Sequence, residues 1–366
     1  MCVAVPGSCD SPAIESESEA QVNNIDEAQD LVESVRAVHV RIRDAVIDAM
    51  VNSTSEEMRL GDGSGGGDTI YGIDRAGEAV LLEMLGMHLE KWLPVVVVAE
   101  GLPDIGVGPG TAVLPPGASP SDARFWVIVD PIDGTRGLMY GKRSAWILTG
   151  ISPIFAGRTP SLRDIEVAVQ TEIPHPKQTL ADTLWAVRGE GATAIRTDLR
   201  TGISSPLPLT PSAADSIGHG FGQVARVFPG GRDVLAAIDD EVCLAVVGPG
   251  GPGKGVTFED QYISTGGQLA ELAFGHDRWT ADLRPLLTPV LAKRGLPPPQ
   301  CCHPYDICTA LIAEEAGVLV VGPKGPLDHP LTLDDNVTWF GYANESIRAL
   351  VEPALLAAIT AYLGPP

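Results

Sequence analysis

Two carboxylates three residues apart, directly after a short apolar segment, are the strongest chemical signal in this sequence. They are Asp130 and Asp133, in the hexapeptide Asp-Pro-Ile-Asp-Gly-Thr that spans residues 130–135. Hard divalent cations prefer oxygen ligands, and two carboxylates with a carbonyl between them can hold one cation or bridge two. The Gly-Thr pair can also offer backbone N–H groups to an anion. Taken alone, the hexapeptide is explained more simply as an Asx-type turn that caps a helix.

Other acidic residues stand at the ends of predicted elements, beside loops that contain glycine. Glu100 ends a predicted strand over residues 93–99, where a buried carboxylate needs a partner. Asp306 lies on the first turn of a predicted helix, and Asp68 and Asp74 flank the start of another. Each has a plain structural explanation, because a strand end can be solvated and acids are favoured at helix N-termini. Their number favours a shared cation site over separate structural roles.

These residues carry a resemblance to a known superfamily. The matching segments stand in the superfamily's order: Asp68-Thr69 to Asp74, the valine-rich strand with Glu100, residues 130–135, His303-Pro304-Tyr305-Asp306, and Ile312-Ala313-Glu314-Glu315-Ala316-Gly317. The set resembles the inositol monophosphatase and fructose-1,6-bisphosphatase superfamily, which are Mg²⁺-dependent and typically lithium-sensitive phosphomonoesterases. The similarity covers roughly residues 30–350. The resemblance implies a hydrolase that acts on a small phosphorylated metabolite, and a homodimer.

The resemblance implies a role for each matching acid. The ligands of two or three Mg²⁺ ions would be the side chains or carbonyl of Glu100, Asp130, Ile132, Asp133 and Asp306. Two cations would neutralise the phosphate, activate a water for in-line attack and stabilise the leaving alkoxide. The family often has a second acid after the residue at 100, whereas Gly101 follows here and offers no ligand to a third ion.

The residues around Thr135 would bind the phosphate and help to deprotonate the attacking water. The resemblance gives Gly134 and Thr135 as N–H donors to the phosphate, with Asp306 beside it, and has Asp74 hydrogen-bonded to the Thr135 hydroxyl. Either that pair or Glu100 would take the proton of the water. Catalysis would thus rest on Glu100, Thr135 and Asp74.

Arg136 departs from the inositol branch and predicts something about the substrate. The chain reads Arg-Gly-Leu over 136–138, nearer the Lys-Gly-Phe of the 3′-phosphoadenosine phosphatase branch than the Asn-Phe of the inositol branch. A guanidinium can hold a second phosphate or a carboxylate with two hydrogen bonds. We therefore expect Arg136 to contact an anionic group of the substrate beyond the scissile phosphate. Inositol phosphates, sugar phosphates and nucleotide 3′-phosphates all stay open as substrates.

Length and charge narrow the function classes further. The chain has 366 residues, with 25 Lys and Arg against 47 Asp and Glu, a net charge of −22. Such a surface repels nucleic-acid backbones and anionic membranes, so we expect neither as a partner. No apolar run approaches the roughly 18 residues of a membrane-spanning helix, and the first residues lack the basic start of a signal peptide. Six cysteines are sparse and fit free thiols, so we expect a cytoplasmic protein.

Helices and strands are predicted to alternate along the whole chain. Periodicity predicts helices over 25–50, 73–89, 234–239, 304–316 and 347–362, and strands over 93–99, 125–129, 145–151, 165–170, 183–187, 242–247, 318–321 and 337–342. Residues 1–24 are predicted to be a disordered tail. A proline-rich passage predicts a boundary between an N-terminal lobe, 25–205, with most metal ligands, and a C-terminal lobe, 206–366, with Asp306. The class is mixed α and β, and the resemblance implies a layered α/β/α/β/α sandwich.

Two other signals support rival functions. Residues 248–255, Gly-Pro-Gly-Gly-Pro-Gly-Lys-Gly, nearly match a P-loop, but Gly255 replaces the Ser or Thr that reaches Mg²⁺. An ATP-using enzyme that works through Lys254 is one alternative, and a phospho-ligand-binding protein without turnover is another. Cys301-Cys302-His303 is the compact cysteine and histidine cluster, yet adjacent cysteines are a poor zinc site and packing beside Asp306 explains them better.

Overall fold

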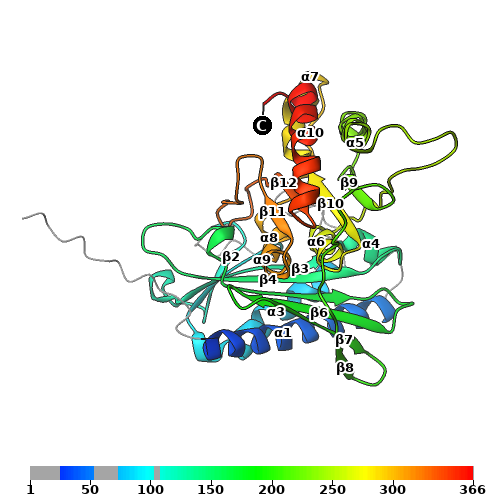
Figure 1. The fold of residues 1–366 in the computed structure, drawn as a ribbon. Coiled ribbons are helices and arrows are strands. Elements are labelled where there is room, and N and C mark those ends of the chain that lie inside the picture. The colour runs from blue at the N-terminus through cyan, green and yellow to red at the C-terminus, as the bar shows by residue number, and fades with distance from the viewer. Residues whose placement is uncertain (1–24, 53–72, 103–107, 366) are drawn as a thin grey trace, which may run out of the picture.

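Five alternating layers of helices and sheets make up the molecule. The computed structural model describes residues 25–52, 73–102 and 108–365 (Figure 1). Asp68 and the predicted tail at 1–24 lie outside them. Helices α1 (Ile25–Asn52) and α3 (Asp74–His88) cover one face of an eight-stranded sheet, and a second, four-stranded sheet lies beyond its other face. The predicted α/β/α/β/α sandwich is confirmed.

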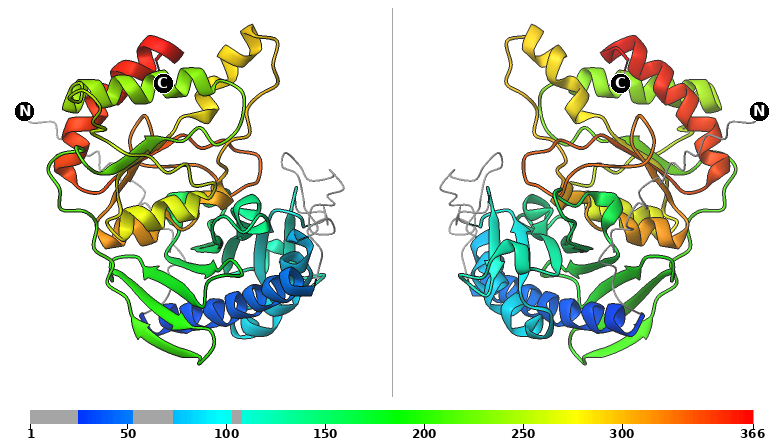
Figure 2. Two further views of the ribbon diagram at one scale, coloured as in Figure 1. Left: turned by 90° about the vertical axis from the view of Figure 1, so that its right-hand side faces the viewer. Right: turned by 90° about the vertical axis from the view of Figure 1, so that its left-hand side faces the viewer.

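The helices of the middle and outer layers come from the second half of the chain. Between the sheets lie α6 (Thr265–Ala273), α8 (Pro304–Ile307) and α9 (Ala310–Ala316), yellow to orange in both views of Figure 2. Helices α5 (Arg232–Val247) and α10 (Glu345–Leu363) cover the outer face of the small sheet. The short α7 (Thr288–Lys293) follows a 3₁₀ turn, Arg284–Leu287.

The large sheet is antiparallel except at one pair of strands, and that pair positions the acids. Its order is β2-β1-β3-β4-β5-β6-β7-β8, with bounds Thr111–Leu114, Val95–Ala99, Phe125–Asp133, Ala145–Pro153, Val167–Ile173, Leu180–Val187, Ala192–Asp198 and Ile203–Pro206. Strands β1 and β3 run parallel, and Ala99 pairs with Val129. Because the two strands are parallel, their carboxyl ends lie at the same end of the sheet. Glu100, which follows β1, therefore lies beside Asp130 of β3.

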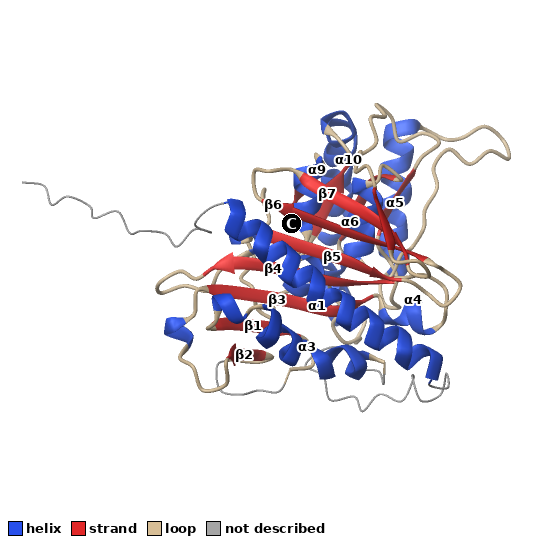
Figure 3. Cartoon of the chain, turned by 90° about the horizontal axis from the view of Figure 1, so that it is seen from below, coloured by secondary structure: helices blue, strands red, loops and turns tan. Residues whose placement is uncertain are grey.

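Helix α1 packs across the large sheet, as the view from below shows (Figure 3). Its apolar side chains recur at three- and four-residue spacing on one face, and all are buried: Leu31, Val35, Val38, Ile42 and Val46. The neighbouring α3 comes very close to the end of β3, because a Cβ at Gly77 would lie 3.3 Å from the Cβ of Pro131. That close approach places Asp74, the first residue of α3, beside the turn after β3.

The small sheet has the order β11-β12-β10-β9, with bounds Leu319–Val321, Trp339–Tyr342, Asp277–Asp282 and Phe221–Val224. Its two tryptophans, Trp279 and Trp339, are fully buried in separate hydrophobic clusters. The boundary at 205/206 between two lobes stays a prediction, and Pro206 is the last residue of the large sheet.

Several predicted elements are wrong, and most of the errors fall in the second half of the chain. The predicted strand over 242–247 is the end of α5: Val242 continues the helical spacing of Leu235 and Ile238, and Leu244 is exposed. The predicted helix over 304–316 is two short helices, α8 and α9. Strands β2 and β7–β10 and helix α6 were not predicted, because their sequences are short or too polar for a clear period.

The structure does not place residues 248–255 between a strand and a helix, as a P-loop would require. Residues 248–255 follow helix α5 rather than a strand, and the next helix, α6, starts only at Thr265. Lys254 is exposed. A P-loop connects a strand directly to a helix whose N-terminus faces the phosphates. This loop has neither neighbour.

Helix α10 is the one helix among the described residues with the length and apolar composition of a membrane-spanning segment. Core helices of globular proteins pass the same test. In α10, Ile347, Val351, Leu355 and Ile359 are fully buried in the cluster formed with the small sheet and α5. The helix is weak evidence for a membrane, and the absence of a membrane partner stays a prediction.

A histidine buried between α1 and the large sheet makes stability depend on pH. His39 is fully buried, with its ring nitrogens 2.8 Å from the Thr149 hydroxyl and 3.0 Å from the Thr171 hydroxyl. Burial lowers the pKa of His39 from 6.5 to about 3. Below pH 6.5 the unfolded chain therefore takes up a proton that the folded chain does not, and stability is lost as the pH falls.

We predict that His39→Gln weakens this pH dependence. Glutamine can bond to both threonine hydroxyls but does not titrate. Between pH 7 and pH 5, the free energy of unfolding of the native protein should fall by about 2 kcal/mol more than that of the variant. Urea unfolding at the two pH values measures the difference. An equal fall in both proteins would show that His39 is not the group responsible.

Candidate active site

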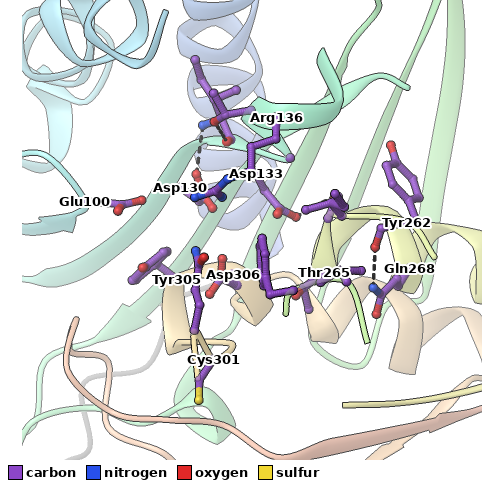
Figure 4. A pocket seen from close by; sticks show the side chains of 18 of the residues that line it. Glu100, Asp130, Asp133, Arg136, Tyr262, Thr265, Gln268, Cys301, Tyr305 and Asp306 are labelled. Atoms are coloured by element: carbon purple, nitrogen blue, oxygen red, sulfur yellow. Dashed lines mark hydrogen bonds between the residues drawn. The ribbon is translucent and has the colours of Figure 1, made fainter. Parts of the chain in front are cut away.

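Four carboxylates from three elements face one another in a cavity between the two sheets (Figure 4). Glu100 follows β1, Asp130 and Asp133 lie at the carboxyl end of β3, and Asp306 is in α8. One oxygen each of Asp130, Asp133 and Asp306 lie within 4.8 Å of one another. The structure thus brings together the four acids that the sequence indicated as ligands. The three aspartates alone could hold a metal ion.

Burial and like charge make this cluster unfavourable without a cation. Asp130 is only 4% exposed, and burial together with Asp133, Asp306 and Glu100 raises its pKa well above the usual range. Burial and the neighbouring Asp133 also raise the pKa of Asp306. Carboxylates crowded in a buried site favour protonation or a bound cation. The donor set, all oxygen and mostly carboxylate, fits Mg²⁺.

The carboxylates of the three aspartates are held by hydrogen bonds that fix their direction. Oδ1 of Asp130 accepts the Ile132 N–H at 2.9 Å, and Oδ2 of Asp306 accepts the His303 N–H at 2.6 Å in a capping-box arrangement. Backbone donors of this kind cannot rotate away. The oxygens that remain on each group can therefore point at a shared ion.

Asp133 is held from the opposite side of the cavity. Its Oδ2 accepts the Ser264 hydroxyl at 2.8 Å and the Gly266 N–H at 2.7 Å, both from the start of α6. Burial raises the pKa of Asp133 to about 6, and these hydrogen bonds partly oppose the shift. Sequence reasoning missed Ser264. The available signal was a Ser that precedes an apolar helix, and its hydroxyl does cap α6 by accepting the Gly267 N–H.

The turn after Asp133 needs a glycine. Gly134 has φ +97°, and a Cβ there would lie 2.9 Å from the carbonyl oxygen of Ile263. The turn leads into the short helix α4 (Thr135–Met139). The Thr135 hydroxyl lies 2.8 Å from Oδ1 of Asp74 and 2.8 Å from the Ile132 carbonyl. Its single proton serves one acceptor at a time, so its lone pairs can accept from a third group.

A second wall of the cavity consists of residues that the sequence did not indicate. Phe228 and Arg284 line it with the predicted Arg136, and Cys301 and Tyr305 lie beside Asp306. Both guanidinium groups lie on the Phe228 ring, 5.0 Å from its centroid for Arg136 and 5.5 Å for Arg284. Arg284 follows β10 in a segment without any local motif, so no sequence signal could have found it.

The two adjacent cysteines lie in different places: Cys301 lines the cavity, whereas Cys302 lies in the core. The thiols of Cys301 and Cys302 are free, and Cys302 is fully buried in the core between the sheets. Burial raises the pKa of Cys301 to about 12, so its thiol is protonated and a poor metal ligand at neutral pH. Packing, as predicted, explains this pair.

Solved structures give the comparison that sequence does not. No family model matches the chain, and no curated protein matches it. Extragenic suppressor protein SuhB from Bartonella henselae superposes with a TM-score of 0.60 at 15% identity, covering 89% of this chain and 98% of that one. Fructose-1,6-bisphosphatase from Leishmania major, in holo form, gives 0.60 at 12% identity, covering 92% and 95%. The chain therefore has the fold of these two proteins, as the resemblance of its sequence to the inositol monophosphatase and fructose-1,6-bisphosphatase superfamily implied.

Proposed function

We propose that this protein is a Mg²⁺-dependent hydrolase of a small phosphate monoester. The observation that carries the proposal is the convergence of Glu100, Asp130, Asp133 and Asp306 beside a hydrogen-bonded Thr135–Asp74 pair. The bisphosphatase named among the structural neighbours supports a phosphatase-type activity. When bound, Mg²⁺ would neutralise the phosphate, lower the pKa of a ligated water and stabilise the leaving oxygen.

The residues of the chain would orient the reactants. Gly134 and Thr135 line the cavity at the turn after β3, and their N–H groups would bind phosphate oxygens. Thr135 Oγ1 would accept a hydrogen bond from the attacking water while donating its own proton to Asp74. Glu100, at the end of β1, is the other candidate base for that water. Arg136 would contact a further anionic group of the substrate.

A protein that only binds its ligand is the remaining alternative. Such a protein needs the phosphate cradle but not a hydroxyl–carboxylate pair at the position of an attacking water. Phosphate release from a monoester with Mg²⁺ and without ATP separates the hydrolase from both a binder and an ATP-using enzyme. The cytoplasmic location and the homodimer stay predictions from the sequence.

We predict that Asp133→Asn abolishes turnover and weakens Mg²⁺ binding while the fold persists. The amide oxygen can still accept the Ser264 and Gly266 hydrogen bonds, but the charge that attracts the cation is lost. In the native protein, Mg²⁺ should raise the melting temperature, because a ligand of the folded state stabilises it. The variant should show a much smaller rise, measured by thermal unfolding and calorimetric titration.

Asp277→Asn is the matched control for that variant. Asp277 is also a buried aspartate, 8% exposed, and burial raises its pKa to about 7, but it does not line the cavity. Its variant should keep the Mg²⁺ response. Near-native activity of Asp133→Asn, or no Mg²⁺ binding by the native protein, would contradict the proposal.

We also predict that Thr135→Ala and Asp74→Asn each lower kcat by roughly 10²–10⁴-fold. Because the two side chains act through one hydrogen bond, the double variant should lose little more than either single variant. Steady-state kinetics of the four proteins form a double-mutant cycle. Simple additivity of the two losses would show that the pair is not a relay.

A further inference from the structure

Arg284 is a buried cation in the wall of the proposed active site, and the proposed chemistry does not use it. It begins the 3₁₀ turn directly after β10 and is 8% exposed. Its side chain lines the same cavity as the four carboxylates. Burial raises the pKa of both Asp133 and Asp306, and the charge of Arg284 partly opposes that rise, so the guanidinium lies within electrostatic range of both.

The protein holds this guanidinium in place but leaves part of it unsatisfied. Nε lies 2.9 and 3.0 Å from the two carboxylate oxygens of Asp282, and Nη2 lies 2.5 Å from one of them. Nη1 donates to the Gln300 carbonyl at 3.2 Å. A guanidinium has five N–H groups. One N–H on Nη1 and one on Nη2 therefore have no acceptor among the described residues.

Buried N–H groups that line a cavity and have no acceptor among the described residues are available to a ligand in that cavity. The side of the guanidinium that carries Nε and Nη2 binds Asp282, so the two remaining N–H groups lie on the two terminal nitrogens, one on each. Two such N–H groups form a fork that matches the two oxygens of a carboxylate or phosphate. The hydrogen bonds to Asp282 and Gln300 hold the fork in one orientation before a ligand arrives.

The position of Arg284 favours the leaving group over the scissile phosphate as its ligand. The proposed phosphate cradle, Gly134 and Thr135, follows a strand of the large sheet, whereas Arg284 follows a strand of the small sheet. The Phe228 ring lies against both Arg284 and Arg136. The two cations thus share one aromatic wall of the cavity.

We propose that Arg284 recognises an oxyanion, carboxylate or phosphate, on the leaving alcohol of the substrate. This inference rests on the proposed phosphatase function and assigns its substrate class: phosphate monoesters that carry a second anionic group. Charge explains the need for a dedicated residue, because a second anion entering beside four carboxylates would otherwise be repelled. The Asp282 carboxylate fixes Arg284 and acts as its positioning residue.

Three propyl phosphates that differ in one group test the assignment. They are 3-hydroxypropyl phosphate, 3-phosphonooxypropanoate and propane-1,3-diol bisphosphate, with a neutral, a carboxylate and a phosphate end. The native enzyme should prefer the anionic substrates, and the better one identifies the natural oxyanion. Arg284→Lys keeps the charge but loses the fork, and should lower kcat/KM for the preferred anionic substrate about 10- to 100-fold, mainly through KM. For the hydroxypropyl ester the loss should stay below about threefold.

A binding measurement keeps the inference testable if turnover is absent. The phosphonates 4-phosphonobutanoate and 4-hydroxybutylphosphonate mimic two of the esters and cannot be hydrolysed. In calorimetric titrations with Mg²⁺ present, the native protein should bind the carboxylate at least about tenfold more tightly, and Arg284→Lys should lose that preference. Tighter binding of the carboxylate without any turnover of the esters would overturn the phosphatase function and keep the Arg284 subsite. Turnover of the esters without tighter binding of the carboxylate would keep the phosphatase function and overturn the subsite.

The controls separate recognition from folding. Arg196→Lys changes an arginine that binds Asp182 through the same two nitrogens, at 2.7 Å each, between β6 and β7 outside the cavity. It should leave all three substrates unaffected. If Arg284→Lys does not fold, the neutral pair Asp282→Asn with Arg284→Gln replaces it and should show the same loss of preference. An equal loss on all three substrates would place Arg284 on the scissile phosphate and overturn the inference.

Discussion

The parallel pairing of β1 with β3 is the constraint on which the site depends. Because Ala99 lies opposite Val129, the residues that follow, Glu100 and Asp130, leave a fully buried part of the sheet together. Every other pair of strands in this sheet is antiparallel, and an antiparallel partner would have brought the start of one strand to the end of the other. The sheet therefore concentrates negative charge at one edge, where burial raises the pKa values of Asp130 and Asp133. The elements around that edge supply its counter-charges and hydrogen bonds.

The second half of the chain contributes residues to the carboxylate cluster as well as covering the end of β1 and β3. Asp306 arrives on α8, and α6 holds Asp133 through Ser264 and Gly266. The fit is close: a Cβ at Gly266 would lie 2.5 Å from the Leu148 side chain and 3.1 Å from Oδ2 of Asp133. The arrangement explains why α6 begins with residues as small as Thr-Gly-Gly although glycine weakens helices. Local helix stability is given up for a hydrogen bond to a proposed metal ligand.

How much the sequence could predict differs between the two halves for physical reasons. The acids near β1, β3 and α8 stand beside strongly apolar segments or in compact motifs, so their places could be found without coordinates. The strand predicted over 242–247 was wrong because a run of apolar residues fits a helix as well as a strand, and only burial of Val242 with exposure of Leu244 distinguishes them. Arg284 could not be found at all, because its significance comes from residues distant in the sequence, Phe228 and the carboxylates of the cavity.

The hydrogen bonds from α6 to Asp133 have a thermodynamic consequence. A proposed ligand from the first half of the chain owes its direction to a helix of the second half, and Asp306 belongs to that second half as well. Cation affinity and the docking of the two halves are then linked quantities, and each must change the other by the same factor. A substitution that destabilises α6 far from any carboxylate would lower the affinity for the cation. Bound cation would in turn stabilise the contact between the two halves. The cation would thus stabilise the tertiary structure as well as take part in the reaction.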